Sequence, residues 1–241
     1  MSTHTPVLKI QGLSFRFNNH SAWFFKNLSI SFNKAAIHFM RGSNGVGKST
    51  LFRVLQGALE QQEVVEGTIV LDGNALSLTT ARHTTMAVLS DSIKMVQQKF
   101  DTMLADRFSF IENLRMGSCG RYPSLCLLPK NAMMPQLLER FSINYDTPVH
   151  LLSGGQRQIL AILMALQKPT KLLLLDEPTA ALDNANAAMV MNFLKELVAS
   201  LDLTVMIICH DKELVHEYSP DGYYEIKLDR ATQCRSIEYV F

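Results

Sequence analysis

The chain has 241 residues, and its 23 Lys and Arg nearly balance its 22 Asp and Glu, which leaves a formal net charge of +1. This balance excludes a broadly basic nucleic-acid-binding protein and an acidic tail protein. Hydrophobic residues make up 47% of the chain, enough for the core of one large domain, so disorder is excluded as its main state.

No membrane span or export signal is visible in the sequence. The longest unbroken apolar stretch runs from Ile159 to Leu166 and is far shorter than the about 18 residues that cross a bilayer as a helix. Met1 to Pro6 contains no cationic cluster followed by an apolar run, so a secretory signal is not expected. We therefore expect a cytoplasmic protein.

The N-terminal third of the chain alternates short apolar runs with turn residues, a pattern typical of strands. The strand candidates are Leu8 to Phe17, Leu28 to Phe32, Ala36 to Met40, Glu63 to Leu71 and Ser92 to Val96. A glycine-rich turn follows Met40, and a helix is predicted from Ser49 to Gln56. Asp72-Gly73-Asn74 is a turn signal that ends the fourth strand candidate. This part of the chain is therefore predicted to be rich in sheet.

The middle and the C-terminal part have a different character. Between about Lys99 and His150 methionine and leucine become frequent, and prolines interrupt the chain, which favours a helical sub-lobe. From Gln156 onward helices alternate with the apolar strands Leu172 to Leu175 and Thr204 to Cys209. Such alternation predicts an α/β fold with parallel strands and crossover helices.

A phosphate-binding loop lies between the strand that ends at Met40 and the following helix. In this motif glycines let backbone N–H groups surround phosphate oxygens, the helix N-terminus adds its positive end, and the lysine contacts the β- and γ-phosphates. Ser49 is predicted to ligate Mg²⁺. The residues of the motif are Gly42, Ser43, Asn44, Gly45, Val46, Gly47, Lys48, Ser49 and Thr50.

Two adjacent carboxylates end the apolar run from Leu172 to Leu175. A buried parallel strand presents such residues at its C-terminal end, where ligands of α/β sheets bind. Beside a phosphate loop, Asp176 is predicted to be a partner of Mg²⁺ and Glu177 to polarise the attacking water. Two solvated acids in a turn are the alternative, which the phosphate loop makes much weaker.

Leu152-Ser153-Gly154-Gly155-Gln156 resembles the signature motif of ATP-binding cassette (ABC) ATPases. Ser153 is expected to cap a helix, and the two glycines allow close backbone approach to an anion. The resemblance implies that this anion is the γ-phosphate of an ATP held by the opposite protomer of a dimer.

Further family markers follow in the expected order. Ala181-Leu182-Asp183 resembles the loop that crosses the dimer interface, and His210 resembles the switch histidine that contacts the γ-phosphate and the catalytic carboxylate. Taken alone, a histidine after an apolar strand is more often structural. The resemblance reverses that preference and places His210 with Glu177 among the catalytic residues.

For two of the expected site residues, a second residue nearby in the sequence is also a candidate. The resemblance implies a glutamine that senses Mg²⁺ and the attacking water, and Gln98 is preferred to Gln97 because the segment after it resembles the corresponding stretch of importer ATPases. It also implies an aromatic residue that stacks on adenine. Phe17 is the candidate, with Phe15 as its competitor and a core strand residue as the simpler interpretation.

The resemblance extends from Leu8 to about Leu228 and implies an ABC-type phosphate-loop NTPase fold. We expect a single nucleotide-binding domain over residues 1–241, with a RecA-like mixed core sheet, an N-terminal antiparallel β subdomain and a helical sub-lobe. Residues 1–98 and 151–241 would form the ATPase core with the β subdomain, and residues 99–150 the sub-lobe.

The implied function is that of an ATPase subunit that binds ATP and Mg²⁺, dimerises or pairs with another ABC subunit, and powers import by a separate membrane permease. A solute-binding protein is expected as a further partner, and nucleic acid is not. The chain would lie peripherally on the inner face of the cell membrane. The alternative is an ABC ATPase of a lipid-handling, cell-division or other mechanical membrane complex.

Two other classes fit the sequence less well. DNA-repair members of the superfamily carry a long coiled coil between the phosphate loop and the signature, whereas the chain shows no sustained heptads there. A binding module without hydrolysis is disfavoured because both Glu177 and His210 are present.

Overall fold

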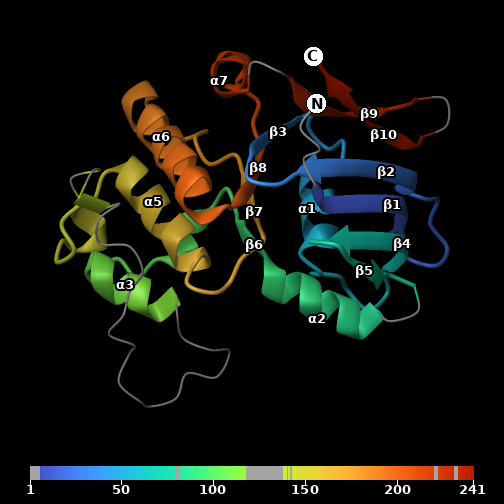
Figure 1. The fold of residues 1–241 in the computed structure, drawn as a ribbon, viewed down its shortest axis with the longest axis horizontal. Coiled ribbons are helices and arrows are strands. Elements are labelled where there is room, and N and C mark those ends of the chain that lie inside the picture. Colours follow the sequence, from blue (N-terminus) through green and yellow to red (C-terminus); the bar gives the residue numbers. More distant parts are fainter. Residues whose placement is uncertain are drawn as a thin grey trace.

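The computed structural model describes residues 6–79, 82–117, 138–139, 141, 143–219, 222–230 and 233–241. The described strands form two sheets (Figure 1). The four-stranded sheet is antiparallel, in the order β2 (Phe25–Asn33), β1 (Pro6–Arg16), β4 (Val64–Leu71) and β5 (Asn74–Ser77). The six-stranded sheet runs in the order β10 (Arg235–Val240), β9 (Tyr223–Leu228), β3 (Ile37–Arg41), β8 (Thr204–Ile208), β7 (Leu172–Asp176) and β6 (Ile93–Val96).

The six-stranded sheet is mixed, as expected. Strands β9, β3, β8, β7 and β6 pair in parallel, and β10 adds to β9 in antiparallel orientation. Figure 1 shows strands β3, β8, β7 and β6 of this sheet between the antiparallel sheet on one side and helices α3, α5 and α6 on the other. The described helices are α1 (Lys48–Leu55), α2 (Arg82–Ser92), α3 (Phe110–Gly117), α5 (Gly154–Ala165), α6 (Asn184–Leu201) and α7 (Lys212–Tyr218), with short 3₁₀ turns η1 (Phe100–Met103) and η2 (Val149–Leu151).

Both faces of the central strands are buried, which explains their unbroken apolar sequences. Along β7, Leu173 and Leu175 join the hydrophobic cluster that contains α5 and α6. Leu172 and Leu174 point the other way and join the cluster that contains α1 and the antiparallel sheet. The period of two along the strand therefore distributes one apolar run between two cores.

Helix α2 and the hairpin of β4 and β5 differ from the sequence-based expectation. Helix α2 was not predicted, because its sequence contains Thr and Ser and lacks a broad apolar stripe. It is held by the buried Leu89 and by the Thr85 hydroxyl, which donates to Ser77 O at 2.7 Å. The turn at Asp72 and Gly73, whose φ angles are 49° and 84°, leads directly into β5 and closes a hairpin.

The predicted sub-lobe is described in part. Residues 118–137, 140 and 142 lie outside the described residues. Within the described part, Phe110, Leu114 and Val149 are fully buried in the cluster that contains α5 and α6. Within the described ranges, no helix has the length and apolar content that a bilayer crossing requires.

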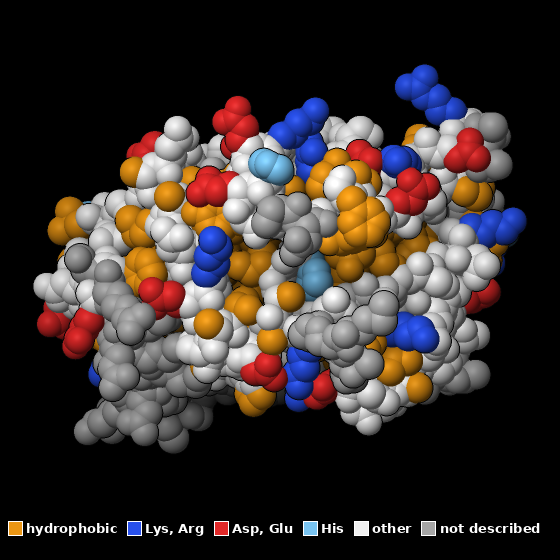
Figure 2. Space-filling model, turned by 45° about the horizontal axis from the view of Figure 1, so that its top comes forward, with side chains coloured by type: hydrophobic (Ala, Val, Ile, Leu, Met, Phe, Trp, Pro, Cys, Tyr) orange, Lys and Arg blue, Asp and Glu red, His pale blue; other side chains and the backbone are white. Residues whose placement is uncertain are grey.

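The surface charge is mixed. Figure 2 shows acidic and basic side chains interspersed over the face that turns forward from the top of Figure 1, with hydrophobic side chains gathered between them. Neither sign of charge forms a continuous field on this face, in agreement with the net charge of +1.

The two-sided core predicts a large loss of stability for Leu174→Ala. Leu174 is fully buried, so the truncation should lower the free energy of unfolding by about 3 kcal/mol through lost burial and an unfilled cavity. Leu228→Ala is the matched control, because Leu228 lies on a strand of the same sheet but is 38% exposed. Urea denaturation followed by circular dichroism measures both, and equal losses would contradict this placement of the core.

Candidate functional site

The predicted phosphate loop connects the end of β3 to the start of α1. Gly42 and Gly47 have φ angles of 150° and 114°, where L-residues are strained. A Cβ on Gly47 would lie 2.6 Å from Phe24 Cε1, and one on Gly42 would lie 2.7 Å from Ile226 O. The loop is thus packed closely against β9 and Phe24, while Ser43, Asn44 and Gly45 are exposed.

The start of α1 fits an anion. No side chain caps this end of the helix, and its first turn carries no acidic residue. Backbone N–H groups there have no intrahelical partner, and the helix dipole favours negative charge at this end. The loop and the helix therefore form a cradle of the type that holds phosphate groups.

Lys48 is buried beside this cradle and is 7% exposed. Its Nζ donates to Gly42 O at 2.9 Å and to Ser43 O at 3.1 Å, so the ammonium lies along the loop. Burial lowers the pKa of Lys48, and the negative charges of Glu177 and Asp176 partly oppose that shift. The Lys48 ammonium thus lies along the loop, and the two nearby carboxylates favour its charged form.

Oxygen ligands lie beside the loop. Ser49, exposed at the start of α1, donates its hydroxyl to Asp176 Oδ2 at 2.8 Å, which brings together two residues far apart in sequence. A hydroxyl and a carboxylate beside phosphate oxygens are the ligand types that Mg²⁺ prefers. The donor set therefore fits this ion, and the half-buried Thr50 follows on the same helix.

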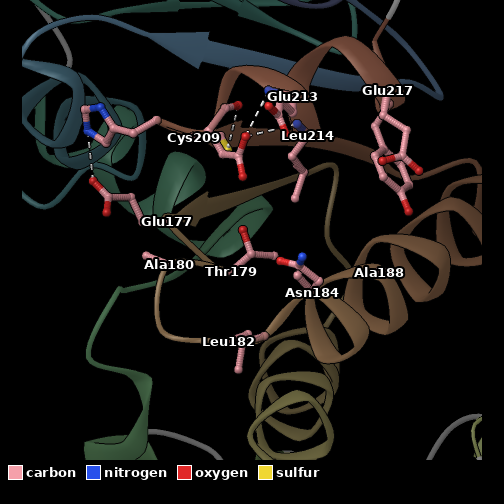
Figure 3. A pocket seen from close by; sticks show the side chains of 14 residues that line it. Glu177, Thr179, Ala180, Leu182, Asn184, Ala188, Cys209, Glu213, Leu214 and Glu217 are labelled. Carbon is pink, nitrogen blue, oxygen red and sulfur yellow. Dashed lines mark hydrogen bonds and ion pairs between the residues drawn. The ribbon is translucent and has the colours of Figure 1, made fainter.

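Glu177 lies at the centre of the predicted catalytic residues. Its Oε1 is 3.0 Å from His210 Nε2, and its Oε2 accepts a hydrogen bond from Gln98 Nε2 at 3.2 Å (Figure 3 shows the contact with His210). The backbone of Glu177 has a φ of 52°, an unfavourable conformation for a residue with a side chain, and its N–H donates to Ile208 O at 3.0 Å. This turn at the end of β7 directs the carboxylate towards the end of β8.

The two pairs of competing candidates differ in position. Gln98 contacts Glu177, whereas the exposed Gln97 makes no hydrogen bond within the described residues. Phe17 is 41% exposed and packs edge-on against Phe24 at 5.0 Å, whereas Phe15 is fully buried. An exposed ring beside the loop is available to stack on a base, and a buried ring is not. The geometry thus favours Gln98 and Phe17.

The predicted helix cap at Ser153 is confirmed. Ser153 Oγ accepts from Gln156 N at 3.2 Å, and Gln156 Oε1 accepts from Ser153 N at 3.0 Å, which completes a capping box at the start of α5. Gly154 follows the cap and shares a cavity of about 190 Å³ with Gln98 and Glu177. Within the described residues, the segment Ser153 to Gln156 makes no hydrogen bond to the phosphate loop.

A larger cavity, of about 510 Å³, lies between the segment after β7 and helix α7. Glu177 and His210 line one part of it, and side chains of α6 and α7 line the remainder (Figure 3). Asp183, at the start of α6, accepts from Asn186 N at 2.8 Å. Hydrogen bonds from Asn186 lower the pKa of the Asp183 carboxyl, so this side chain is held as an anion.

Three contacts involve residues that the sequence analysis did not single out. Arg235 Nε donates to Val46 O in the loop at 2.9 Å, and its guanidinium lies 3.5 Å from the centre of the Phe24 ring. Asp101 pairs with Arg157 at 3.2 Å, which links η1 to α5. Ser153 Oγ donates to Asn186 Oδ1 at 3.0 Å. No motif marks Arg235, Asp101 or Asn186, because each acts through a contact between distant segments.

Residues 25–180 match the family model described as ABC transporter. The chain is 32% identical to the phosphonates import ATP-binding protein PhnC of Staphylococcus haemolyticus over 201 residues, which cover 80% of this chain and 76% of that protein. It is also 32% identical to PhnC 1 of Ruegeria sp. over 221 residues, covering 88% and 83%.

Solved structures give the same result. The fold matches cbiO1 from Clostridium perfringens, part of the ABC transporter complex cbiONQ, with a TM-score of 0.76 and 28% identity over 97% of this chain and 87% of that chain. It also matches a nucleotide-free ATP-binding cassette with a TM-score of 0.71 and 25% identity over 92% and 87%.

The chain therefore belongs to the ABC transporter family. It binds ATP and is an importer-type ATPase subunit, and its two sheets and helical part form an ABC phosphate-loop NTPase.

Arg235→Ala is expected to weaken ATP binding about tenfold, because Val46 O loses a charged donor and the loop loses a support. Titration of the chain with ATP in a calorimeter measures the effect. Lys227→Ala is the control, because Lys227 is an exposed cation of the same hairpin that pairs with Glu225 and Glu238. Equal ATP affinities in the two variants would show that Arg235 does not hold the loop.

Proposed function

We propose that two copies of the chain, or this chain and a related ABC subunit, close over two ATP molecules and couple their hydrolysis to import by a membrane permease. The observation that carries this proposal is the position of Glu177, which is held between Gln98 and His210 beside the Ser49 and Asp176 pair. That arrangement combines phosphate binding, a metal ligand set and a positioned carboxylate at one edge of the sheet.

In this proposal the phosphate loop and Lys48 hold the phosphates of ATP, and Phe17 stacks on the adenine. Ser49, Asp176 and Gln98 would hold Mg²⁺, which neutralises phosphate charge and orients the γ-phosphate. Lys48 contributes its own positive charge there, because its ammonium can turn from the loop carbonyls to phosphate oxygens.

Glu177 is proposed to accept a hydrogen bond from the attacking water and hold it in line with the γ-phosphate. His210 contacts one carboxylate oxygen and Gln98 the other, so the two side chains fix the orientation of the acid. The lone pairs of Glu177 that these contacts leave open are directed at the water. His210, whose side chain is 41% exposed, is free to contact the γ-phosphate as well.

The second half of each site is proposed to come from the other protomer. Ser153, Gly154, Gly155 and Gln156 cap a helix whose end can receive an anion, yet they make no hydrogen bond to the loop of their own chain within the described residues. Asp183 and the loop before it would cross the same interface. ATP binding then favours closure, and hydrolysis favours opening.

The permease is proposed to bind the part of the chain between residues 99 and 150, the helical sub-lobe, while residues 1–98 and 151–241 form the ATPase core. Two large hydrophobic side chains are exposed here, Met103 at 41% and Phe108 at 50%, and Leu151, directly after the sub-lobe, is 67% exposed. A hydrogen bond from Val149 N to Phe108 O joins two of their segments. Exposed apolar side chains that lie together indicate a protein contact.

This arrangement places the chain on the inner face of the membrane, attached through its permease, with a solute-binding protein on the outside. The relatives named above import phosphonates, and the ATPase subunit itself offers no site for the imported solute in this proposal. The solute would be selected by the permease and the binding protein.

Glu177→Gln is expected to lower the rate of ATP hydrolysis at least about 100-fold, because the amide cannot act as a base for the water. ATP binding and ATP-dependent dimerisation should persist, since the loop and signature are unchanged. Phosphate release measures hydrolysis, ATP titration measures binding, and sedimentation measures dimerisation. Glu213→Gln, an acid that lines the same cavity, is the control, and full turnover in Glu177→Gln would remove Glu177 from this role.

Affinity purification of the chain from solubilised membranes tests the partners. We expect a permease with several membrane spans, together with a solute-binding protein. A lipid-binding or cell-division protein in place of these two would contradict the proposed assembly and leave the ATPase chemistry intact.

A further inference from the structure

Asn186, in the first turn of α6, makes hydrogen bonds to both segments that one protomer would present to the other. Its Oδ1 accepts from Ser153 Oγ at 3.0 Å. Its Nδ2 donates to Asp183 Oδ2 at 2.9 Å, and its backbone N–H donates to Asp183 Oδ1 at 2.8 Å. One amide side chain therefore bridges the signature segment and the start of α6.

The orientation of this amide is fixed from both ends. Ser153 must donate its single hydroxyl proton to an acceptor, and Asp183 as an anion accepts only from donors. An amide whose oxygen faces Ser153 and whose nitrogen faces Asp183 satisfies both groups. The opposite orientation would oppose oxygen to oxygen at Asp183, so the bridge has one favourable form.

Packing makes the bridge tight. A Cβ on Gly155 would lie 2.7 Å from Asn186 Oδ1, and one on Gly154 would lie 2.8 Å from Leu182 Cδ2. Both glycines of the signature thus lie against side chains of the segment that contains Asp183, and a larger residue at either position would require Leu182 or Asn186 to shift.

We propose that Asn186 is a positioning residue that joins Ser153 to Asp183, so that the two segments that one protomer offers to its partner's ATP are held in a fixed relation before the dimer closes. The inference rests on the proposed function, in which Ser153 and Asp183 act across the dimer interface. Asn186 itself touches neither nucleotide nor water in this proposal.

The bridge also fixes the hydroxyl of Ser153. Its proton is donated to Asn186, and its oxygen accepts from Gln156 N. To donate to a γ-phosphate, the hydroxyl must turn away from Asn186, while the Asn186 amide keeps its bonds to Asp183. The bridge therefore holds Ser153 in place before closure, which lowers the entropic cost of ordering it during closure.

The test uses the full chain with Glu177→Gln, so that hydrolysis does not intervene, and adds Asn186→Ala. ATP binding to the monomer, measured by titration with a fluorescent ATP analogue at low protein concentration, should stay within about twofold because the loop is untouched. ATP-dependent dimerisation, measured by sedimentation, should weaken about tenfold. A residue with a merely structural role would change both affinities or the melting temperature.

Asn186→Asp is the second variant and is compatible with the first turn of a helix. It keeps the acceptor for Ser153 but loses the donor to Asp183 and adds repulsion, so dimerisation should weaken here too. Asn184→Ala is the matched control, since this exposed asparagine of the same turn makes no side-chain hydrogen bond within the described residues and should dimerise like the parent.

The outcomes distinguish failure of the Asn186 role from failure of the proposed dimer. If Asn186→Ala dimerises as tightly as the parent, or loses monomer ATP binding to the same degree, the positioning role is wrong. If the Glu177→Gln parent itself binds ATP but does not dimerise, the proposed dimer fails, and the role of Asn186 fails with it.

Discussion

The parallel pairing of β3, β8 and β7 is the constraint on which the site depends. Because these strands run in the same direction, their carboxyl ends meet at one edge of the sheet, and the residues after them meet there as well. The phosphate loop follows β3, Glu177 follows β7 and His210 lies just beyond β8. Burial of both faces fixes the register, since a slip by one residue would exchange the two cores and displace the three segments together.

At that edge, the Lys48 ammonium and the Glu177 carboxylate are both held by hydrogen bonds within the protein. Lys48 is buried and donates to loop carbonyls, so its charge is partly satisfied before any phosphate arrives. Glu177 adopts a left-handed backbone conformation and is oriented by two neighbours. Strain in the turn and hydrogen bonds to the side chain together hold the acid in one direction, which reduces the reorganisation that catalysis would otherwise require.

The local structures of the site could be predicted from the sequence, whereas contacts between distant segments could not. The phosphate loop, the run Leu172 to Glu177 and the cap at Ser153 are local patterns, and each adopts the predicted local structure. Helix α2 was missed because it has no broad apolar stripe of its own. Contacts with neighbouring segments stabilise it instead. Arg235, Asn186 and the pair of Asp101 with Arg157 were missed because their partners are distant in sequence.

The signature segment and the phosphate loop are held by different parts of the molecule. Ser153 caps α5 and is bonded to Asn186, and Gly154 and Gly155 are packed against the start of α6, so the whole segment is anchored to the helical side of the molecule. The phosphate loop is anchored to β9, β10 and Phe24 on the other side. In the proposed assembly, the phosphate loop of one copy and the signature of a second copy, each held by its own support, together form the complete site. The energy of ATP binding would then be released as contact between protomers, which is the form in which the proposed permease could use it.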